Sequence, residues 1–366
     1  MQKNLVTPIQ PERILVIIMR YLGDVLLATP LMSSLRKTFI TSEIDALVFE
    51  NTANILEGFS DINNIVTIPT NPTFNEQLLF YKRLFRKYDL VVNTQTGDRP
   101  FIASLVASST RIGAVPQNRE KGQWKRLFYD GWTEFDDENT HTVLQHLKLA
   151  DVLSIPRVYK TSPPRSNLDT NIIPNQKYAI LHPHPKWHYK RWPIENWIAT
   201  GRYLNQLGLQ VMISGSANKE EKNYISQIHD QLPDQTINLS GKLSLAELST
   251  IIKHAQIFIG PDTGITHLAA ATGIPVIALF GPTNPVKWAP WPYNYHLDKN
   301  PFKKNGSQNV SNIYLAQGPG DCVPCHQEGC EQNRLSFSHC LESLSFTTIK
   351  PFIDQSLQGH SNSHKT

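Results

Sequence analysis

The strongest constraint on the fold is an alternation of short apolar segments with helical patterns, which occurs twice along the chain. In the first half, residues 14–19, 44–49, 65–68 and 90–92 have the length and composition of buried strands, with helical segments between them. The alternation restarts with strand candidates at the following positions: 178–182, 210–214, 237–239, 255–259 and 276–280. This order of elements predicts an α/β protein with doubly wound parallel sheets.

Residues 156–175 separate the two halves, because they are rich in Pro, Ser, Asn and Thr and lack periodicity. We therefore expect two Rossmann-like domains, over residues 1–160 and 177–345, joined by a linker over residues 161–176. Residues 346–366 are expected to form a C-terminal tail that frays from about residue 355. Two such domains facing a central cleft are an architecture that binds a ligand between them.

Composition limits the possible partners. The chain has 366 residues, 40% hydrophobic and 18% charged, which is typical of a soluble globular protein. A net charge of +4 argues against a dedicated nucleic-acid binder and suits anionic small molecules or an acidic membrane surface. The apolar run at residues 14–19 is too short for a signal peptide or a membrane span. We expect a cytoplasmic protein with at most peripheral membrane contact.

The turn at residues 260–267 is the first candidate site. It follows a strand candidate and opens a short helix, where Asp262 or Thr263 can cap and Gly264 lets the backbone approach a ligand. Free N–H groups and the positive end of the helix form an anion site, so a phosphate is the expected ligand. The alternative is an ordinary capped helix.

A second candidate site lies at residues 182–193, which contain three histidines and three cations. Lys186, Lys190 and Arg191 can neutralise a diphosphate leaving group as charge develops on it. A metal on the histidines is the less favoured interpretation, because no carboxylate or cysteine lies nearby in the sequence.

A third candidate is Asp24, which follows the first strand candidate. A carboxylate at the carboxyl end of a strand can act as a general base. The alternative is a first-turn carboxylate that only stabilises the helix dipole.

Residues 115–142 are less regular and mix cations with aromatic residues, so they can contact anionic lipid head groups or an anionic glycolipid. The alternative, which we favour, is a solvated loop with some aromatic packing. The residues concerned are Arg119, Lys121, Lys125 and Arg126, with Trp124, Phe128 and Tyr129.

All four cysteines lie in a C-x2-C-x4-C-x9-C pattern formed by Cys322, Cys325, Cys330 and Cys340. This spacing is compatible with one structural zinc site, while disulfides and free thiols remain open. None of these interpretations gives the cysteines a catalytic role.

Three motifs together resemble the lipopolysaccharide heptosyltransferase family, glycosyltransferase family 9, which has the GT-B fold. They are Arg-Tyr-Leu-Gly-Asp-Val-Leu-Leu with Thr-Pro at residues 20–30, Lys-Arg-Trp-Pro at 190–193, and Gly-Pro-Asp-Thr-Gly at 260–264 with His267. Residues 91–99, 111–113 and the cysteine segment are similar to the heptosyltransferase III type. The chain departs from the family at residues 182–185, where the family more often has a small loop containing Gly or Ala.

The resemblance implies an inverting transfer of heptose from ADP-heptose to the lipopolysaccharide inner core. Asp24 would deprotonate the acceptor hydroxyl, and Lys190 with the N–H groups of Thr263 and Gly264 would hold the diphosphate. No metal is required for catalysis in this scheme, because protein cations and the helix end replace it. The other implied site residues are Glu220 or Glu221 at the ribose, Asp262 and His267 in the donor pocket, and Gly23, Asp98 and Arg99 on the acceptor side.

The implied partners are ADP-heptose, a core glycolipid acceptor and the inner face of the inner membrane, without nucleic acid. Two alternatives remain: a GT-B transferase that uses another nucleotide sugar, or a non-catalytic nucleotide-binding member of core-assembly machinery. Asp24 and Lys190 argue against the second, because a scaffold needs neither. A dehydrogenase is less favoured, because residues 20–24 lack the G-x-G-x-x-G fingerprint.

Overall fold

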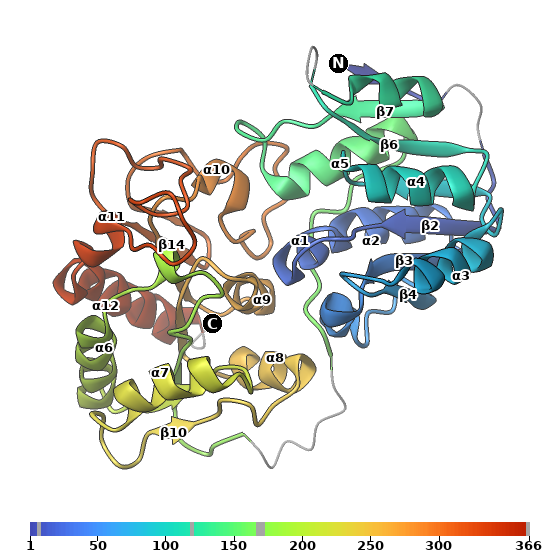
Figure 1. Ribbon diagram of the computed structural model, residues 1–366. Coiled ribbons are helices and arrows are strands. Elements are labelled where there is room, and N and C mark those ends of the chain that lie inside the picture. Colours follow the sequence, from blue (N-terminus) through green and yellow to red (C-terminus); the bar gives the residue numbers. More distant parts are fainter. Residues whose placement is uncertain (6–8, 118–120, 166–172, 364–366) are drawn as a thin grey trace. The chain divides into compact units, whose positions relative to one another are not determined.

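The computed structural model describes residues 1–5, 9–117, 121–165 and 173–363 (Figure 1). The chain forms two compact units. The first contains residues 1–164 and 296–299, and the second contains residues 165–295 and 300–366. The expected linker, residues 161–176, spans the boundary between them, and its residues 166–172 lie outside the described part of the chain.

The first unit is built on a seven-stranded sheet in which only β1 pairs antiparallel. Its central strands are buried along most of their length, as expected where helices cover both faces of a parallel sheet. In spatial order the strands are β1 (Gln2–Lys3), β7 (Gly131–Glu134), β6 (Arg111–Val115), β5 (Leu90–Asn93), β2 (Arg13–Ile17), β3 (Glu43–Phe49) and β4 (Asn64–Ile68).

The strand order of this unit reverses between β2 and β5, so the loops after these two strands meet at the point where doubly wound sheets bind ligands. Helices α1, α2 and α5 contact one another, whereas α3 and α4 contact each other and share a separate core cluster with strand residues. The helical elements are α1 (Leu22–Leu27), α2 (Thr29–Thr38), η1 (Glu50–Leu56), α3 (Phe74–Leu84), α4 (Asp98–Ala107), η2 (Gln123–Phe128) and α5 (Thr142–Val152).

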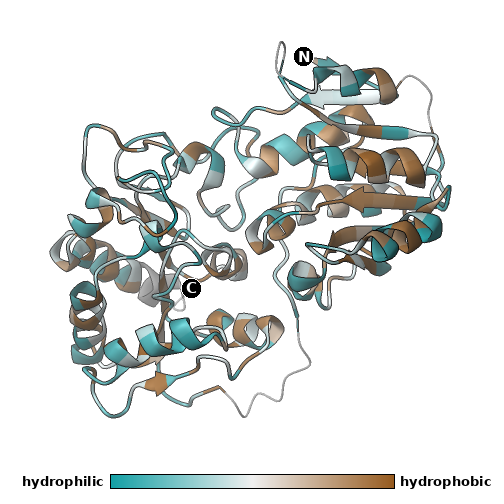
Figure 2. Cartoon of the chain, viewed as in Figure 1, coloured by the Kyte–Doolittle hydropathy of each residue, from teal (hydrophilic) through white to brown (hydrophobic). Residues whose placement is uncertain are grey.

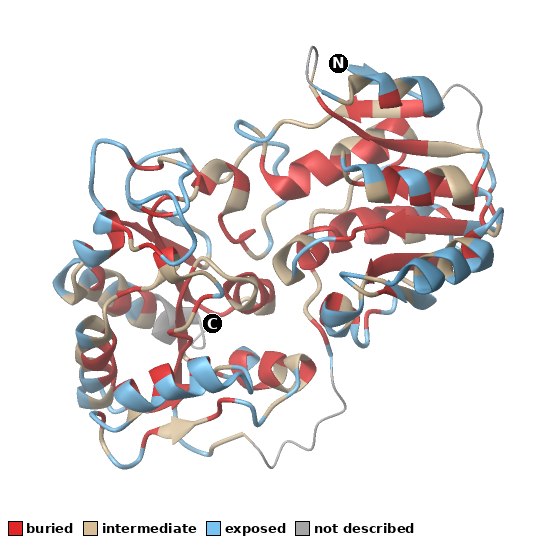
Figure 3. Cartoon of the chain, viewed as in Figure 1, coloured by how far each residue is buried: buried red, intermediate tan, exposed pale blue. Residues whose placement is uncertain are grey.

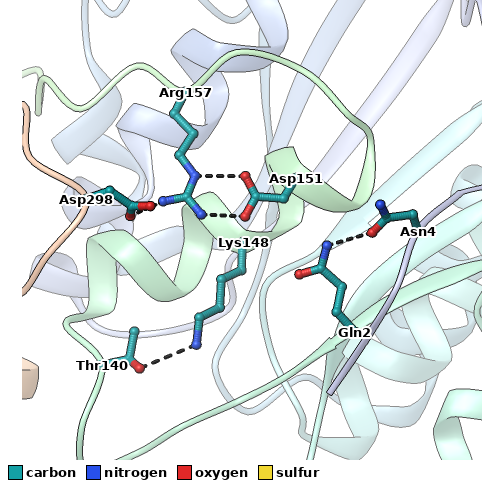
Figure 4. Close-up of polar contacts among 7 residues, drawn as sticks. All are labelled: Gln2, Asn4, Thr140, Lys148, Asp151, Arg157 and Asp298. Carbon is teal, nitrogen blue, oxygen red and sulfur yellow. Dashed lines mark hydrogen bonds and ion pairs between the residues drawn. The ribbon is translucent and has the colours of Figure 1, made fainter.

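Residues 296–299 belong to the first unit although the chain on both sides of them belongs to the second. Arg157 holds this segment: its guanidinium donates to Asp298 and, through Nε at 2.8 Å, to Asp151 of α5 (Figure 4). The ring of Tyr159 also contacts His296, with 6.5 Å between ring centroids. The sequence pattern did not indicate this second passage of the chain into the first unit.

The second unit also contains a seven-stranded sheet, in which only β13 pairs antiparallel. Its order reverses between β8 and β11, which are hydrogen-bonded neighbours. In spatial order the strands are β10 (Ile237–Asn238), β9 (Gln210–Ile213), β8 (Tyr178–Leu181), β11 (Ile257–Pro261), β12 (Val276–Phe280), β14 (Ile313–Gln317) and β13 (Gln308–Val310). The expectation of two α/β units with doubly wound, mainly parallel sheets is therefore confirmed.

The core of the second unit contains Trp192 and Trp197, whose rings meet edge to face at 4.9 Å. These residues lie just before and within α6, so the Trp-Pro step after the basic loop anchors that loop to the core. The helical elements of this unit are η4 (His188–Lys190), α6 (Ile194–Gln206), α7 (Lys219–His229), α8 (Leu245–Lys253), α9 (Gly264–Thr272), α10 (Pro285–Trp288), α11 (His339–Glu342) and α12 (Phe346–Ser363).

The C-terminal segment corrects one expectation. Residues 346–366 were expected to be a tail that frays from residue 355, but α12 extends over Phe346–Ser363. Its Ile349 and Ile353 lie four residues apart, are fully buried and belong to the core of the second unit. The sequence did not predict this helix, because the last residues are mostly polar. No helix in the described part of the chain has the length and apolar character needed to cross a membrane.

Candidate functional site

The amino end of α9 forms the centre of the site in the second unit. β11 ends at Pro261, and Thr263 caps the helix by accepting a hydrogen bond from the N–H of Thr266 at 3.4 Å. Helix geometry leaves the N–H groups of the first turn without intrahelical acceptors, so those of Gly264 and the residues beside it are available to an anion. The predicted cap is confirmed, and it lies at the carboxyl end of a central strand.

Lys190 and Asp262 form an ion pair at this helix end, with 2.5 Å between Nζ and Oδ2. Their side chains are only 18% and 8% exposed. Burial alone would raise the pKa of Asp262, but the charge and hydrogen bond of Lys190 outweigh it and lower the pKa below its usual value. The pair therefore places a cation beside a helix end while Asp262 stays ionised.

His267 lies one turn into α9 and is buried. Its Nδ1 is buried and has no hydrogen-bond partner among the described residues. Burial lowers the pKa of His267 to about 4, so the imidazole is neutral at pH 7. A buried imidazole nitrogen without a partner is costly, and a ligand group that hydrogen-bonds to it would remove that cost.

The loop after β8 separates the histidines and cations that the sequence groups together. His182 Nδ1 lies 3.0 Å from the Ser214 hydroxyl at the end of β9, and burial lowers the pKa of His182 to about 4. His188 Nδ1 lies 2.9 Å from the carbonyl of Ser336. Lys190 faces Asp262, whereas Arg191 pairs with Glu220 at 2.5 Å. The structure thus places Lys190 at the amino end of α9 and Arg191 at the start of α7.

Glu220 and Glu221 both lie in the first turn of α7, which Asn218 caps, but they point to different neighbours. The carboxylate of Glu220 is mostly exposed and pairs with Arg191, whose hydrogen bond lowers the pKa of Glu220. Glu221 is buried and accepts a hydrogen bond from Ser216 in the loop after β9. Glu221 therefore lies at the carboxyl edge of the sheet.

In the first unit, Gly23 and Asp24 form the first turn of α1, directly after the loop that follows β2. The carboxylate of Asp24 is 12% exposed and lies 3.5 Å from Nε of Arg20. Gln95, in the loop after β5, hydrogen-bonds to both the N–H and the carbonyl of Met19. It thus ties together the two loops at the point where strand order reverses. Sequence analysis did not select Gln95, although its place after a central strand was a usable signal.

Asp98 and Arg99 open α4, and each already has a partner in the first unit. Asp98 is exposed and pairs at 2.6 Å with Lys125, whose hydrogen bond lowers the pKa of Asp98. Arg99 donates to the carbonyls of Pro69 and Thr70, each at 2.7 Å. Arg99 therefore holds the connection between β4 and α3, and only Asp98 presents an exposed charged group.

The basic and aromatic residues within 115–142 are partly buried and partly exposed. Lys125 is buried and donates to the carbonyl of Thr96, so it does not contribute to a cationic surface. Trp124 and Phe128 remain exposed. Arg119 lies outside the described residues.

The four cysteines are free thiols, and Cys340 is buried. Burial raises the pKa of Cys340 to about 11. Within residues 1–5, 9–117, 121–165 and 173–363, no group of three or more His, Cys, Asp or Glu side chains is placed to hold a metal ion. The structural zinc site that the cysteine spacing allows is therefore not confirmed.

Comparison with known proteins places these features in a family. Residues 78–312 match glycosyltransferase family 9 (heptosyltransferase). Lipopolysaccharide heptosyltransferase 3 of Escherichia coli K12 is 30% identical over 297 residues, which cover 75% of this chain and 84% of the relative.

Two solved structures share the fold. Heptosyltransferase II of E. coli matches with a TM-score of 0.72 and 18% identity, covering 95% of this chain and 99% of its own. E. coli heptosyltransferase WaaC with ADP matches with a TM-score of 0.70 and 19% identity, covering 94% and 99%. Both the GT-B fold and the expected resemblance are confirmed. The chain belongs to glycosyltransferase family 9, the heptosyltransferases.

Proposed function

We propose that this protein transfers heptose from ADP-heptose to a hydroxyl of the lipopolysaccharide inner core, with inversion at the anomeric carbon. The observation that carries the proposal is the amino end of α9 in a family 9 chain, where Lys190 and Asp262 lie beside N–H groups that have no intrahelical acceptor. Such a site suits a diphosphate, and relatives of this chain are named as lipopolysaccharide heptosyltransferases.

The second unit holds the donor in this proposal. The N–H groups of Thr263 and Gly264 and the ammonium of Lys190 bind the diphosphate, whose negative charge increases as the bond to the sugar breaks. Asp262 positions Lys190 without requiring a large movement, because the pair is already formed. His267 offers a neutral ring nitrogen for a hydrogen bond to the donor.

Asp24 in the first unit acts as the general base. Its carboxylate takes the proton of the acceptor hydroxyl while that oxygen bonds to the anomeric carbon, and the bond to the diphosphate breaks to release ADP. Attack from the face opposite the leaving group inverts the anomeric carbon. Gly23, Asp98 and Arg99 belong to the acceptor side, with Arg99 shaping it through the carbonyls that it holds.

For the nucleotide ribose we favour Glu221 over Glu220. A Cβ on Gly215 would lie 3.0 Å from Oε1 of Glu221, so this carboxylate covers the glycine at the end of β9. Carboxylates in this position accept hydrogen bonds from ribose hydroxyls in doubly wound folds. Glu220 instead neutralises Arg191 at the surface.

The acceptor class implies the place of action. A core glycolipid is anchored in a membrane and ADP-heptose is a nucleotide sugar, so we propose a cytoplasmic enzyme at the inner face of the inner membrane. The proposed transfer calls on no metal. A zinc ion on the four cysteines remains a prediction of their spacing, and metal analysis of the purified chain tests it.

The function is tested by incubating the full chain with ADP-heptose and core acceptors of defined length, and following ADP release and product mass. We expect product heavier by one heptose, and loss of turnover by at least about a thousandfold in Asp24→Asn with ADP affinity retained. Glu57→Gln, an exposed carboxylate of the same unit, is the matched control. Transfer only from another nucleotide sugar overturns the donor assignment, and full turnover in Asp24→Asn removes the proposed base.

A further inference from the structure

The outer face of α3 carries large apolar side chains that nothing in the described structure covers. Phe80, Tyr81 and Leu84 turn inward and pack on the core of the first unit. Other large apolar side chains of this helix face solvent: Phe74 is 79% exposed, and Leu78 and Leu79 are also exposed. Phe85, just after the helix, is 68% exposed. Phe74 and Leu78 lie four residues apart and thus form one stripe.

Cations accompany these apolar residues. Lys82, Arg83 and Arg86 are exposed, and of the cations in this stretch only Lys87 forms an ion pair among the described residues, at 3.7 Å from Asp45. The acidic residue of the helix, Glu76, accepts hydrogen bonds from the backbone N–H and hydroxyl of Thr73 in a capping box. Figures 2 and 3 show α3 with apolar and polar residues side by side on a mostly exposed helix. Exposed cations therefore outnumber acids on this helix.

Two further elements continue the same face. The crossovers through α3, α4 and η2 all lead in one direction along the sheet, so right-handed connections place them on one side of it. α3 contacts α4, and Phe101 of α4 contacts Trp124 and Phe128 of η2 at 5.5 and 5.9 Å. The exposed large side chains on α4 and η2 are Ile102, Trp124, Leu127 and Phe128.

We propose that this face of the first unit, formed by α3, α4 and η2, docks on an anionic phospholipid bilayer. Phe74, Leu78 and Phe85 enter the head-group region, and the nearby cations contact lipid phosphates. Apolar tips spread over three elements and flanked by cations fit a fluid interface, which needs no shaped complement. The proposal rests on the proposed function only in that a glycolipid acceptor places the substrate in a bilayer.

A second copy of the chain is the other occupant that such a face can have. In a two-fold dimer the same patch would face itself, so Lys82, Arg83 and Arg86 would meet like charges. A bilayer with anionic lipids instead supplies the opposite charge. The observations therefore favour the membrane.

The test measures cosedimentation of the full chain with vesicles of zwitterionic phospholipid, with and without anionic phospholipid. We expect binding that requires anionic lipid and weakens with salt. The double variant Phe74→Ser/Leu78→Ser lowers binding by at least about tenfold. In the double variant Lys82→Glu/Arg83→Glu, each of the two substitutions lowers binding by at least about fivefold. Ile40→Ser and Lys37→Glu, exposed changes elsewhere in the first unit, are the matched controls and leave binding unchanged.

The result is separated from the enzyme assay by measuring ADP release with a soluble, delipidated acceptor, which the α3 variants leave unchanged. If vesicle binding behaves as expected but no variant or wild-type protein transfers heptose, the proposed function fails and the docking face stands. Equal binding of wild-type and α3 variants, or no binding to anionic vesicles, overturns the docking face. The docking face is also overturned if light scattering shows a dimer of the wild-type protein that Phe74→Ser/Leu78→Ser dissociates.

Discussion

The pair between Lys190 and Asp262 allows a prediction that separates folding from ligand binding. In Lys190→Ala, the buried carboxylate of Asp262 loses the cation that keeps it ionised. Removing one partner of a buried pair typically costs 3–5 kcal/mol, and because the Lys190 side chain keeps some exposure we expect about 3 kcal/mol. The additional change Asp262→Asn removes the uncompensated charge and should restore about 2 kcal/mol.

The pH dependence of this loss follows from the direction of the shift. In the wild type the pKa of Asp262 is lowered, so the pair contributes stability above the unfolded pKa of about 3.9 and loses it as the pH falls through the lower folded value. In Lys190→Ala burial dominates and raises the pKa, so ionisation then opposes folding as the pH rises. The difference between variant and wild type should therefore grow from about pH 4 to pH 7.

Urea unfolding across this pH range measures the free-energy difference, and calorimetry with ADP measures binding at pH 7. We expect the double variant to recover stability but not ADP affinity, because it still lacks the ammonium. A stability difference that does not change with pH would refute the role of the pair, and ADP affinity equal to wild type would remove Lys190 from the diphosphate site.

Three further predictions concern the framework. Ile353→Ala should lower the free energy of unfolding of the second unit by about 3 kcal/mol in urea melts, because α12 contributes a fully buried side chain. Gly318→Ala should destabilise this unit by about 2 kcal/mol or more in the same assay, since the new Cβ would lie 2.0 Å from the carbonyl oxygen of Cys340. Arg157→Met should speed amide hydrogen exchange in residues 296–299 by about tenfold, because the guanidinium that holds this segment is lost. Unchanged exchange in that segment would show that other contacts hold it.

Most of the sheet topology could be predicted from the sequence because buried parallel strands are continuous apolar runs. The strand expected at 14–19 is β2, and the one expected at 276–280 is β12. The strands that were missed include β7, which lies between β1 and β6 and has a Gly131-Trp132 step, and the edge strand β13, which has two polar residues; neither has such a run. The edge strands β4 and β10 were predicted. The helix α12 was not predicted, because two isoleucines in an otherwise polar segment are too few to give a clear helical periodicity.

The site shows the same limit. The sequence correctly predicted a cap at Thr263, because a polar residue stands directly before the helix. It also correctly predicted that Lys190 lies beside Asp262, because both belong to motifs that resemble the donor site of the family. The partners of Arg99 and Lys125 were not predictable, because backbone carbonyls far along the chain are invisible in a side-chain pattern. Hydrogen bonds to backbone carbonyls therefore identify Arg99 and Lys125 as cations that hold the fold.

The passage of residues 296–299 into the first unit matters for anyone who wishes to recombine this enzyme with a relative. A chimera that exchanges the two halves at residue 164 would combine Arg157 from one parent with Asp298 from the other. Arg157 and Asp298 should therefore come from the same parent, which requires residues 296–299 to be exchanged together with the N-terminal half. The segment 296–299 therefore depends on a residue of the N-terminal half, Arg157, although the chain on both sides of it belongs to the second unit.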